Sequence, residues 1–277
     1  MRKLLSANLA RLRKDRVFWC LLAVVVAISL AIVLQGIGSF EAANAHGVMV
    51  KVEDYYFNLS ILIGIFSALF SSLFLGTEYS DGTIRNKLAA GHRRVHVFLA
   101  GYVACLAASL AFLAGWLVTS CLDFLLIGPM EMSGQEFAAY ILVAVGFTAS
   151  FTALFTLVGS LSSNKAMTII YALLVFVLLI LLASGIYDRL CELETLGGMA
   201  YVNGEYVNIP PTPNPLYLGG NVRGFWECAM DFLPTGQAGL MNETAIEHPF
   251  REVGFSVVLT AVALFAGCRA FRRKDIK

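Results

Sequence analysis

The chain has 277 residues, of which 58% are hydrophobic and 14% are charged, and its formal net charge is +1 at pH 7. The apolar share exceeds that of ordinary soluble domains and the charge content falls below theirs, so the composition predicts an all-α membrane protein with several crossings. The net charge is close to zero because opposite charges are separated along the chain, which is a signal of topology and not of a basic or acidic partner, and we therefore expect no nucleic-acid partner.

Residues 1–16 are predicted to form an amphipathic helix that lies on the inner face of the membrane. Leu5, Leu9 and Leu12 recur at i, i+4 and i+7, while Lys and Arg occupy the other face. Such a helix places its leucines in the acyl boundary and its cations near anionic headgroups, so membrane lipid is an expected partner. The alternative is a disordered basic leader that serves only to orient the chain.

Six stretches contain no Asp, Glu, Lys or Arg and are predicted to be transmembrane helices. They are residues 17–37, 57–76, 97–122, 137–161, 166–186 and 253–268. About 20 helical residues cross a hydrocarbon core of about 30 Å, so five of the stretches span it unaided. The sixth has 16 residues and needs its flanking residues to complete the crossing. Residues 17–186 therefore hold helices one to five, and residues 253–277 hold the sixth helix and a basic tail.

The distribution of positive charge predicts that both termini lie in the cytoplasm. When residues 1–16 are placed inside, only Lys51, Arg189, Arg223 and Arg251 fall outside, and every other Lys and Arg is cytoplasmic. The opposite orientation breaks this pattern at every loop. We therefore expect a multi-pass protein of the plasma membrane of a bacterium.

Small residues line one side of two of the stretches, which predicts close packing between helices. In the second and fourth stretches these residues are Ser60, Gly64, Ser67, Ser71, Thr148, Thr152, Thr156, Gly159 and Ser163. A polar pathway lined by the same side chains is the alternative. Asp123, at the outer end of the third stretch, is expected to reach the headgroup region. No stretch holds an ionisable group at mid-depth, so ion-coupled transport is not expected.

Residues 77–94, between the second and third stretches, are predicted to include a short amphipathic helix on the cytoplasmic side. Ser80 or Asp81 can cap its first turn, and Ile84 and Leu88 share one face at i, i+4. An apolar ridge inside a charged rim suits a docking surface for a soluble partner. The alternative is a solvated turn whose cations only fix the topology.

Residues 187–252 are predicted to form an extracellular segment, which is far longer than an ordinary connection. Its run from Ile209 to Pro215 resists helix formation and favours an extended backbone. Aromatic and apolar side chains that favour headgroup depth follow this run, and the candidates for an outer gate are Phe225, Trp226, Met230 and Phe232. The alternative to a gate is a small packed cap with no contact to substrate.

Cys191 and Cys228 lie in the same outer segment, where an oxidising environment permits a disulfide. Two cysteines alone do not decide the matter, so the bridged and free states both stay open. The other four cysteines lie in or at the ends of the stretches and are predicted to pack as small apolar side chains.

The sequence of the 77–94 loop resembles the coupling loop of ABC-2 type transporter permeases. The residues that carry the resemblance are Glu78, Tyr79, Gly82, Thr83, Ile84, Leu88 and Arg94. The surrounding order of a basic amphipathic helix, six spans, a long outer segment and a short basic tail at residues 271–277 is similar to that family as well. The resemblance implies that the loop docks into a cleft on an ATP-binding subunit. Ile84 and Leu88 then fill the cleft, Gly82 permits a tight backbone approach, and Glu78 and Arg94 contact the rim.

The resemblance further implies two permease subunits, identical or homologous, and two copies of the ATP-binding subunit. ATP and Mg²⁺ are expected on that partner, because this chain has no Gly-x-x-x-x-Gly-Lys-Ser/Thr loop. We therefore expect a transport subunit that is not an enzyme and that binds no cofactor of its own. His92 and His96 have the spacing of a metal pair but lack a third ligand, so no metal site is expected.

The resulting prediction is the transmembrane permease subunit of an ATP-driven ABC exporter that moves an amphipathic peptide or a hydrophobic compound out of the cell. Gly91 and Arg93 stand where many members have Pro and Ser, which resembles the branch of peptide-antibiotic and bacteriocin immunity exporters. The alternative is a membrane receptor or immunity protein that binds a peptide through residues 187–252 without transporting it.

Overall fold

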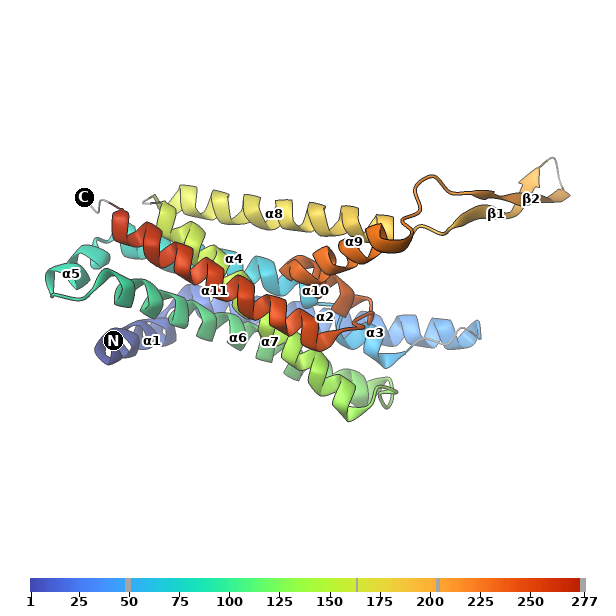
Figure 1. Ribbon diagram of the computed structural model, residues 1–277. Coiled ribbons are helices and arrows are strands. Elements are labelled where there is room, and N and C mark those ends of the chain that lie inside the picture. The colour runs from blue at the N-terminus through green and yellow to red at the C-terminus, as the bar shows by residue number, and fades with distance from the viewer. Residues whose placement is uncertain (48–50, 163, 203–204, 275–277) are drawn as a thin grey trace.

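The computed structural model describes residues 1–47, 51–162, 164–202 and 205–274 (Figure 1). The described residues are mainly helical, and the sheet among them is a single antiparallel hairpin. Two features of the sequence prediction lie outside the described residues. They are Ser163 of the fourth stretch and the tail residues Asp275, Ile276 and Lys277.

The secondary structure begins with a helix that covers the predicted amphipathic segment and ends with the sixth long helix. α5 occupies the loop between the second and third predicted stretches. In chain order the elements are α1 (Arg2–Lys14), α2 (Arg16–Ala45), α3 (Val52–Tyr56), α4 (Ser60–Ser80), α5 (Thr83–Ala89), α6 (Arg94–Leu126), α7 (Gly134–Leu161), α8 (Lys165–Leu190), β1 (Thr195–Val202), β2 (Glu205–Pro213), α9 (Gly220–Phe232), α10 (Pro234–Asn242) and α11 (Pro249–Arg273).

Among the described residues, six helical segments are long and apolar enough to cross a membrane, and they confirm the predicted six-helix architecture. They are α2, α4 together with α3, α6, α7, α8 and α11, and each contains one of the predicted stretches. α11 has 25 residues, so the short sixth stretch gains the flanking residues that it needs. The chain is accordingly a multi-pass membrane protein.

The bundle is built around α4. In its membrane-spanning window 72% of the residues are buried, whereas the corresponding share is 22% in α2 and 17% in α8 and in α11. The small residues predicted as packing faces lie in this interior, and Ser60, Ser67, Ser71, Thr148, Thr152 and Thr156 have no exposed surface. Phenylalanine rings from α4, α6 and α7 surround them. Within this chain the small residues therefore serve helix packing, as predicted.

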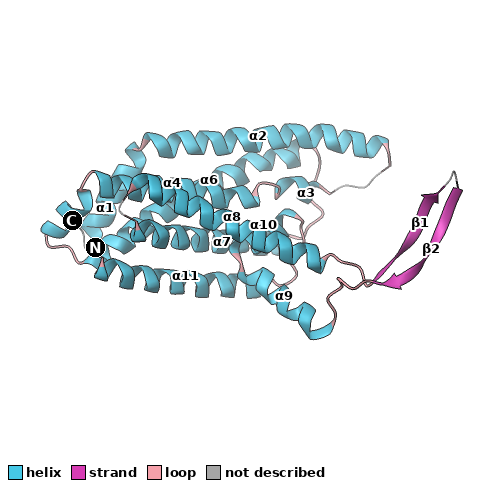
Figure 2. Ribbon diagram, turned by 90° about the horizontal axis from the view of Figure 1, so that it is seen from above, coloured by secondary structure: helices cyan, strands magenta, loops and turns pink. Residues whose placement is uncertain are grey.

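The N-terminus and the last turn of α11 lie at one end of the bundle together with α5, and the β1–β2 hairpin lies at the other end (Figures 1 and 2). We call these the terminal end, which comprises α1, α5 and the last turn of α11, and the hairpin end, which comprises β1, β2 and α9. An even number of long helices between the two termini produces this arrangement.

The buried face of α1 differs in part from the predicted one. Leu4, Asn8 and Leu12 are buried against the protein at i, i+4 and i+8. Leu9 is 38% exposed and Leu5 is partly exposed, so these two leucines stay on the open side. Leu12 was expected to face lipid, but α1 packs against α6, and Leu12 is buried in the protein as a result.

At the hairpin end, the predicted extracellular segment is divided between a projecting hairpin and helices that return to the bundle. The hairpin extends away from the helices (Figure 2), and residues 209–213 are extended, as predicted. α10 instead enters the bundle and packs against α4, α7 and α8. Ala238 and Met241 have no exposed surface as a result. Part of the segment is thus an element of the core.

Asp123 lies in α6 and has no exposed surface, so the expectation that it reaches the headgroup region is wrong. Tyr56, the last residue of α3, lies beside it, and the Tyr56 ring stacks on that of Phe124 with centroids 4.9 Å apart. The chain before α4 therefore folds over this end of α6. The sequence pattern places a residue along a helix but does not show which other segment covers it.

Candidate functional site

The turn from α4 into α5 depends on Gly82. Its φ of +65° lies in the left-handed region that glycine adopts at least cost. A Cβ at this position would meet no atom nearer than 3.9 Å, so within the chain Gly82 is needed for its backbone conformation and not for lack of space. Thr83 Oγ1 then donates to the carbonyl oxygen of Glu78 at 3.1 Å, which fixes the start of α5 to the end of α4.

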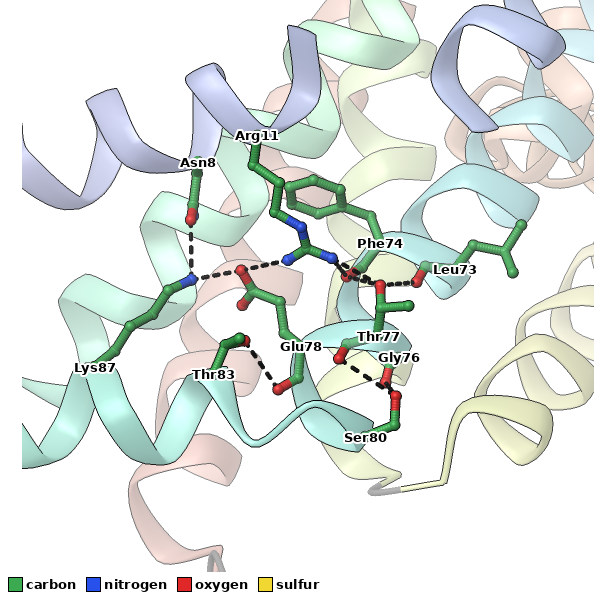
Figure 3. Close-up of polar contacts among 10 residues, drawn as sticks. All are labelled: Asn8, Arg11, Leu73, Phe74, Gly76, Thr77, Glu78, Ser80, Thr83 and Lys87. Atoms are coloured by element: carbon green, nitrogen blue, oxygen red, sulfur yellow. Dashed lines mark hydrogen bonds and ion pairs between the residues drawn. The ribbon is translucent and has the colours of Figure 1, made fainter. Parts of the chain in front are cut away.

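The Glu78 carboxylate is the centre of a buried charged network (Figure 3). Arg11 Nη1 donates to Glu78 Oε1 at 2.9 Å, and Lys87 Nζ donates to the same oxygen. Lys87 Nζ also donates to Asn8 Oδ1 at 2.9 Å. We call Asn8, Arg11, Glu78 and Lys87 the Glu78 network. It joins α1 to α4 and α5, and α1 lies far from both in the sequence.

The surroundings of Glu78 explain why it carries two cationic partners. The residue is 2% exposed, and a carboxylate deprived of water is costly unless cations and donors replace its hydration. The guanidinium of Arg11 is itself fixed, because its Nη2 donates to Thr77 Oγ1 at 2.7 Å and to the Phe74 carbonyl oxygen at 3.1 Å. Its Cζ also lies 4.3 Å from the centroid of the Phe74 ring. These contacts therefore fix the orientation of the Arg11 guanidinium toward Glu78.

The apolar side of α5 faces the protein. Ile84 is 3% exposed and packs with Leu4, Phe98 and Phe271, while Leu88 is partly buried against the same cluster. The expectation that Ile84 and Leu88 form an outward ridge is therefore wrong, because residues of the bundle already cover Ile84. The side of α5 that is open to a partner carries exposed residues, which are Arg85, Asn86 and Ala89.

On the other flank of α5, two predicted contact residues bind neighbouring helices. Arg94 Nη1 donates to the carbonyl oxygens of Phe271, at 3.3 Å, and of Lys274. Tyr79 donates through its hydroxyl to the carbonyl oxygen of Ser160 at 3.2 Å. Arg94 was expected at the rim of a partner's cleft, but these bonds use it to hold the end of α11 against α6.

Lys274 completes this flank. Its Nζ donates to the carbonyl oxygens of Ser160 at 2.8 Å and Ser162 at 2.7 Å, and it lies 4.0 Å from the centroid of the Tyr79 ring. Burial of the ammonium lowers the pKa of Lys274 to about 8. The residue after α11 is thereby fixed to α4 and α7.

Sequence reasoning missed Asn8, Arg11, Lys87 and Lys274 as site residues and used the cations only to orient the chain. Arg11 and Glu78 are 67 residues apart, and only the fold brings α1 beside the end of α4. One signal was present, since Glu78 directly follows an apolar stretch, where a carboxylate needs a cationic partner.

The predicted gate residues lie on α9 and separate into two groups. Phe225 is 66% exposed, Trp226 37% and Phe232 38%, so these three face the surroundings. Met230 is 3% exposed and packs in a cluster with residues of α8 that include Ala183 and Ile186. Only Met230 among the four therefore faces the interior of the chain.

Two cavities adjoin Met230. The first, of about 190 Å³, lies between α4, α8, α9 and α10, with Ile61, Ala183 and Thr235 in its wall. Its exposed wall is mainly apolar, and Tyr187 also lines it. Apolar walls with a few polar groups are typical of sites that receive small molecules or side chains.

The second cavity, of about 240 Å³, has charged walls. Arg251 Nε donates to Asp231 Oδ2 at 2.6 Å, and Arg223 Nε donates to Glu227 Oε1 at 3.0 Å. Burial raises the pKa of Asp231, and the Arg251 guanidinium opposes that shift. An apolar and a charged cavity thus meet at Met230, an arrangement that suits an amphipathic molecule.

Gln237 of α10 has no exposed surface and is fully hydrogen-bonded to neighbouring elements. Its Nε2 donates to the carbonyl oxygens of Asp231 at 2.6 Å and Glu252 at 2.9 Å. Its Oε1 accepts from Ser256 Oγ at 2.7 Å. One side chain therefore joins α10 to α9 and α11.

Two further bonds join α10 to the membrane-spanning helices. Ser60 Oγ, at the start of α4, donates to the Ala238 carbonyl oxygen at 2.7 Å. Thr235 Oγ1 donates to the Leu179 carbonyl oxygen of α8 at 2.8 Å. These bonds fix α10 to both α4 and α8.

The last predicted candidates are the two cysteines of the outer segment and the side chains that could bind a metal. Cys191 and Cys228 are exposed free thiols, so the disulfide that their position allows is not formed. Among the residues that the structure describes, no group of three or more His, Cys, Asp or Glu side chains is placed to hold a metal ion.

Comparison with known proteins assigns no family. No family model matches the chain, and no curated protein matches its sequence. Function is therefore inferred from the geometry at the two ends of the bundle and from the sequence of the loop.

Proposed function

We propose that this chain is the transmembrane permease subunit of an ATP-driven ABC exporter, with its terminal end in the cytoplasm. The observation that carries the proposal is the Glu78 network, which fixes α5 to α1 and to the end of α4. Close-packed elements joined by buried ion pairs move together and transmit strain. A surface helix bound in this way can pass a displacement to a central span.

An ATP-binding subunit contacts the outward side of α5, at Arg85, Asn86 and Ala89. Movement of α5 is passed to α4 through Glu78, and α4 carries Ser60, which binds α10, at its other end. Glu78 and Ser60 are separated by about 27 Å along the axis of α4, at about 1.5 Å per residue. Motion at the terminal end therefore reaches the cavities beside Met230 at the hairpin end.

The proposed cargo is an amphipathic peptide or a hydrophobic compound, which is supported by the apolar and charged walls on either side of Met230. The chain acts with a second permease subunit, identical or homologous, and with two ATP-binding subunits that hold ATP and Mg²⁺. Energy enters at the partner subunits, and the chain supplies the pathway through the membrane.

Copurification of the chain with an ATP-binding subunit tests the proposal. Arg85→Glu combined with Ala89→Glu introduces two carboxylates on the outward side of α5 and leaves the Glu78 network intact. We expect the double variant to insert in the membrane, to keep its thermal stability and to lose the partner. Substituting Ile84 would be less informative, because that side chain is part of the fold.

The matched control is Arg13→Glu combined with Lys14→Glu, which places the same number of carboxylates on exposed positions of α1. We expect this control to retain the partner. Equal retention by both double variants would overturn the assignment of α5 as the docking element.

The projecting hairpin favours a second candidate, a membrane receptor or immunity protein that binds a peptide at the hairpin end without transport. Replacing residues 196–212 by a short Gly-Ser linker separates the two functions. A receptor loses peptide binding and never requires nucleotide. An exporter keeps its partner, and its transport stops when nucleotide is withdrawn.

A further inference from the structure

A groove with apolar and basic walls lies at the terminal end of the bundle. It has a volume of about 370 Å³ and is formed by the start of α6 and the last turns of α11. One part of its wall is apolar and the other is basic. The apolar part is Val95, Phe265 and Cys268, and the basic part is Arg269, Arg272 and Arg273.

The apolar part continues along α11 as an exposed stripe. Val258, Val262 and Phe265 are 53%, 59% and 72% exposed, and they are spaced four and three residues apart. Arg269 and Arg272 continue the same spacing, so all five residues share one face of the helix. This face passes from purely apolar to cationic at the point where α11 reaches the terminal end.

Within the part of the chain that the structure describes, the arginines of the groove, Arg269, Arg272 and Arg273, face no carboxylate partner. Their neighbour Arg94 differs, because it already donates to backbone carbonyl groups of Phe271 and Lys274. Guanidinium groups present a planar set of donors that matches the oxygens of a phosphate.

A soluble partner fits this surface poorly, because Val258 and Val262 lie within a membrane-spanning helix. A ligand that contacts the whole stripe must have a long apolar part within the bilayer and an anionic group at its surface. Basic pockets between transmembrane helices bind lipids of this kind.

We propose that this groove is a binding site for an anionic glycerophospholipid of the leaflet at the terminal end. An acyl chain lies along Val258, Val262 and Phe265, and the phosphate is bound by the three arginines. The site goes beyond the proposed transport function, and it holds whether or not an ATP-binding subunit is the partner.

Native mass spectrometry of the purified chain tests the site by titration with phosphatidylglycerol or with phosphatidylcholine of the same acyl chains. The variant is R269Q/R272Q/R273Q, and the matched control R13Q/K14Q/R16Q removes the same charge from exposed positions near α1. One cation near a membrane surface changes anionic lipid affinity by about fivefold. We expect the groove variant to lose at least about tenfold in phosphatidylglycerol affinity, and the control to lose less, with phosphatidylcholine unchanged in both. Equal losses in the two triple variants would overturn the proposal.

A second measurement uses the unaltered chain and therefore does not depend on how the variant folds. A photoactivatable phosphatidylglycerol is crosslinked in vesicles, and we expect the modified peptides to contain Val95 or Phe265. Crosslinks confined to other segments would contradict the site. Displacement by millimolar inorganic phosphate would identify free phosphate as the ligand instead, and protection by an ATP-binding subunit would identify the groove as a protein contact. Either result overturns the lipid assignment.

Discussion

At the scale of single residues, Glu78 is the position on which the terminal end depends. Its side chain is 3% exposed, whereas those of Arg11 and Lys87 are 31% and 17% exposed. The carboxylate is therefore the most deeply buried charge of the three, and its two partners can still reach water. Loss of the carboxylate leaves two cations near one another with no anion between them.

Glu78→Gln is expected to lower the free energy of unfolding by about 2 to 3 kcal/mol. Breaking a buried ion pair by removal of one partner costs about 3 to 5 kcal/mol, and the partial exposure of Arg11 and Lys87 reduces the loss. Unfolding of the purified chain in detergent measures the change. The matched control is Glu131→Gln, which breaks an exposed pair with Lys51 and is expected to cost no more than about 1 kcal/mol. A loss at Glu78 as small as that of the control would contradict this role.

Lys274 gives the terminal end a dependence on pH. Its pKa is lowered from 10.5 to about 8 by burial, so between these values the unfolded chain binds more protons than the folded one. The contribution of Lys274 to the free energy of unfolding therefore rises as the pH rises through that window. The cost of burying the charge is fully present below about pH 8.

Lys274→Met removes the titration while keeping an unbranched side chain. The stability of the variant relative to the unaltered chain is expected to be highest near neutral pH and to fall as the pH rises from 8 through 10.5, above which the lysine is neutral in both states. Thermal unfolding across this range measures the difference. A difference that stays constant with pH would show that the ammonium carries no burial penalty.

At the scale of elements, the membrane-spanning helices could be predicted, because an uncharged run of sufficient length has few other stable conformations in this composition. The short sixth stretch illustrates the limit. Sequence indicated that α11 needed its flanks, and the structure supplies them. α10 could not be predicted, since its nine residues are of mixed polarity and their burial depends on contacts with four other helices. The inward orientation of the Ile84 side chain could not be predicted either, because it too depends on contacts with other helices.

The close approach of α9 and α10 depends on Gly236. A Cβ at this position would collide with the backbone carbonyl oxygen of Met230. Because backbone cannot rotate away as a side chain does, any larger residue must shift α10 itself. α10 also carries Gln237 and the bonds to α4 and α8, so the shift would disturb the whole region beside the two cavities.

Gly236→Ala is therefore expected to destabilise the chain by about 1 to 3 kcal/mol, the usual range for overpacking a buried site. The matched control is Gly224→Ala in α9, where a Cβ has no neighbour within 4 Å. The control is expected to be neutral or slightly stabilising, because alanine favours helix more than glycine does. Thermal unfolding of both variants in detergent decides the matter, and equal midpoints would exclude the close approach.

At the scale of the whole molecule, α4 connects the two ends at which the chain differs most from a plain helical bundle. Glu78 lies near its last residue and binds α1 and α5, while Ser60 lies at its first residue and binds α10. The helix with the greatest buried share is thus the one that joins α5 to the cavities. This arrangement is meaningful for transport only if the two ends lie on opposite sides of a membrane.

Chemical labelling of cysteines tests that orientation. Cys191 and Cys228 are exposed free thiols at the hairpin end, so a membrane-impermeant maleimide is expected to label both in intact cells. A single cysteine introduced at Arg85, with the natural cysteines replaced, is expected to react only after the cells are opened, because α5 lies at the terminal end. The positive charge gathered at that end supplies the physical reason. Labelling of position 85 in intact cells would place α5 outside, where no ATP-binding subunit could reach it, and would exclude the exporter.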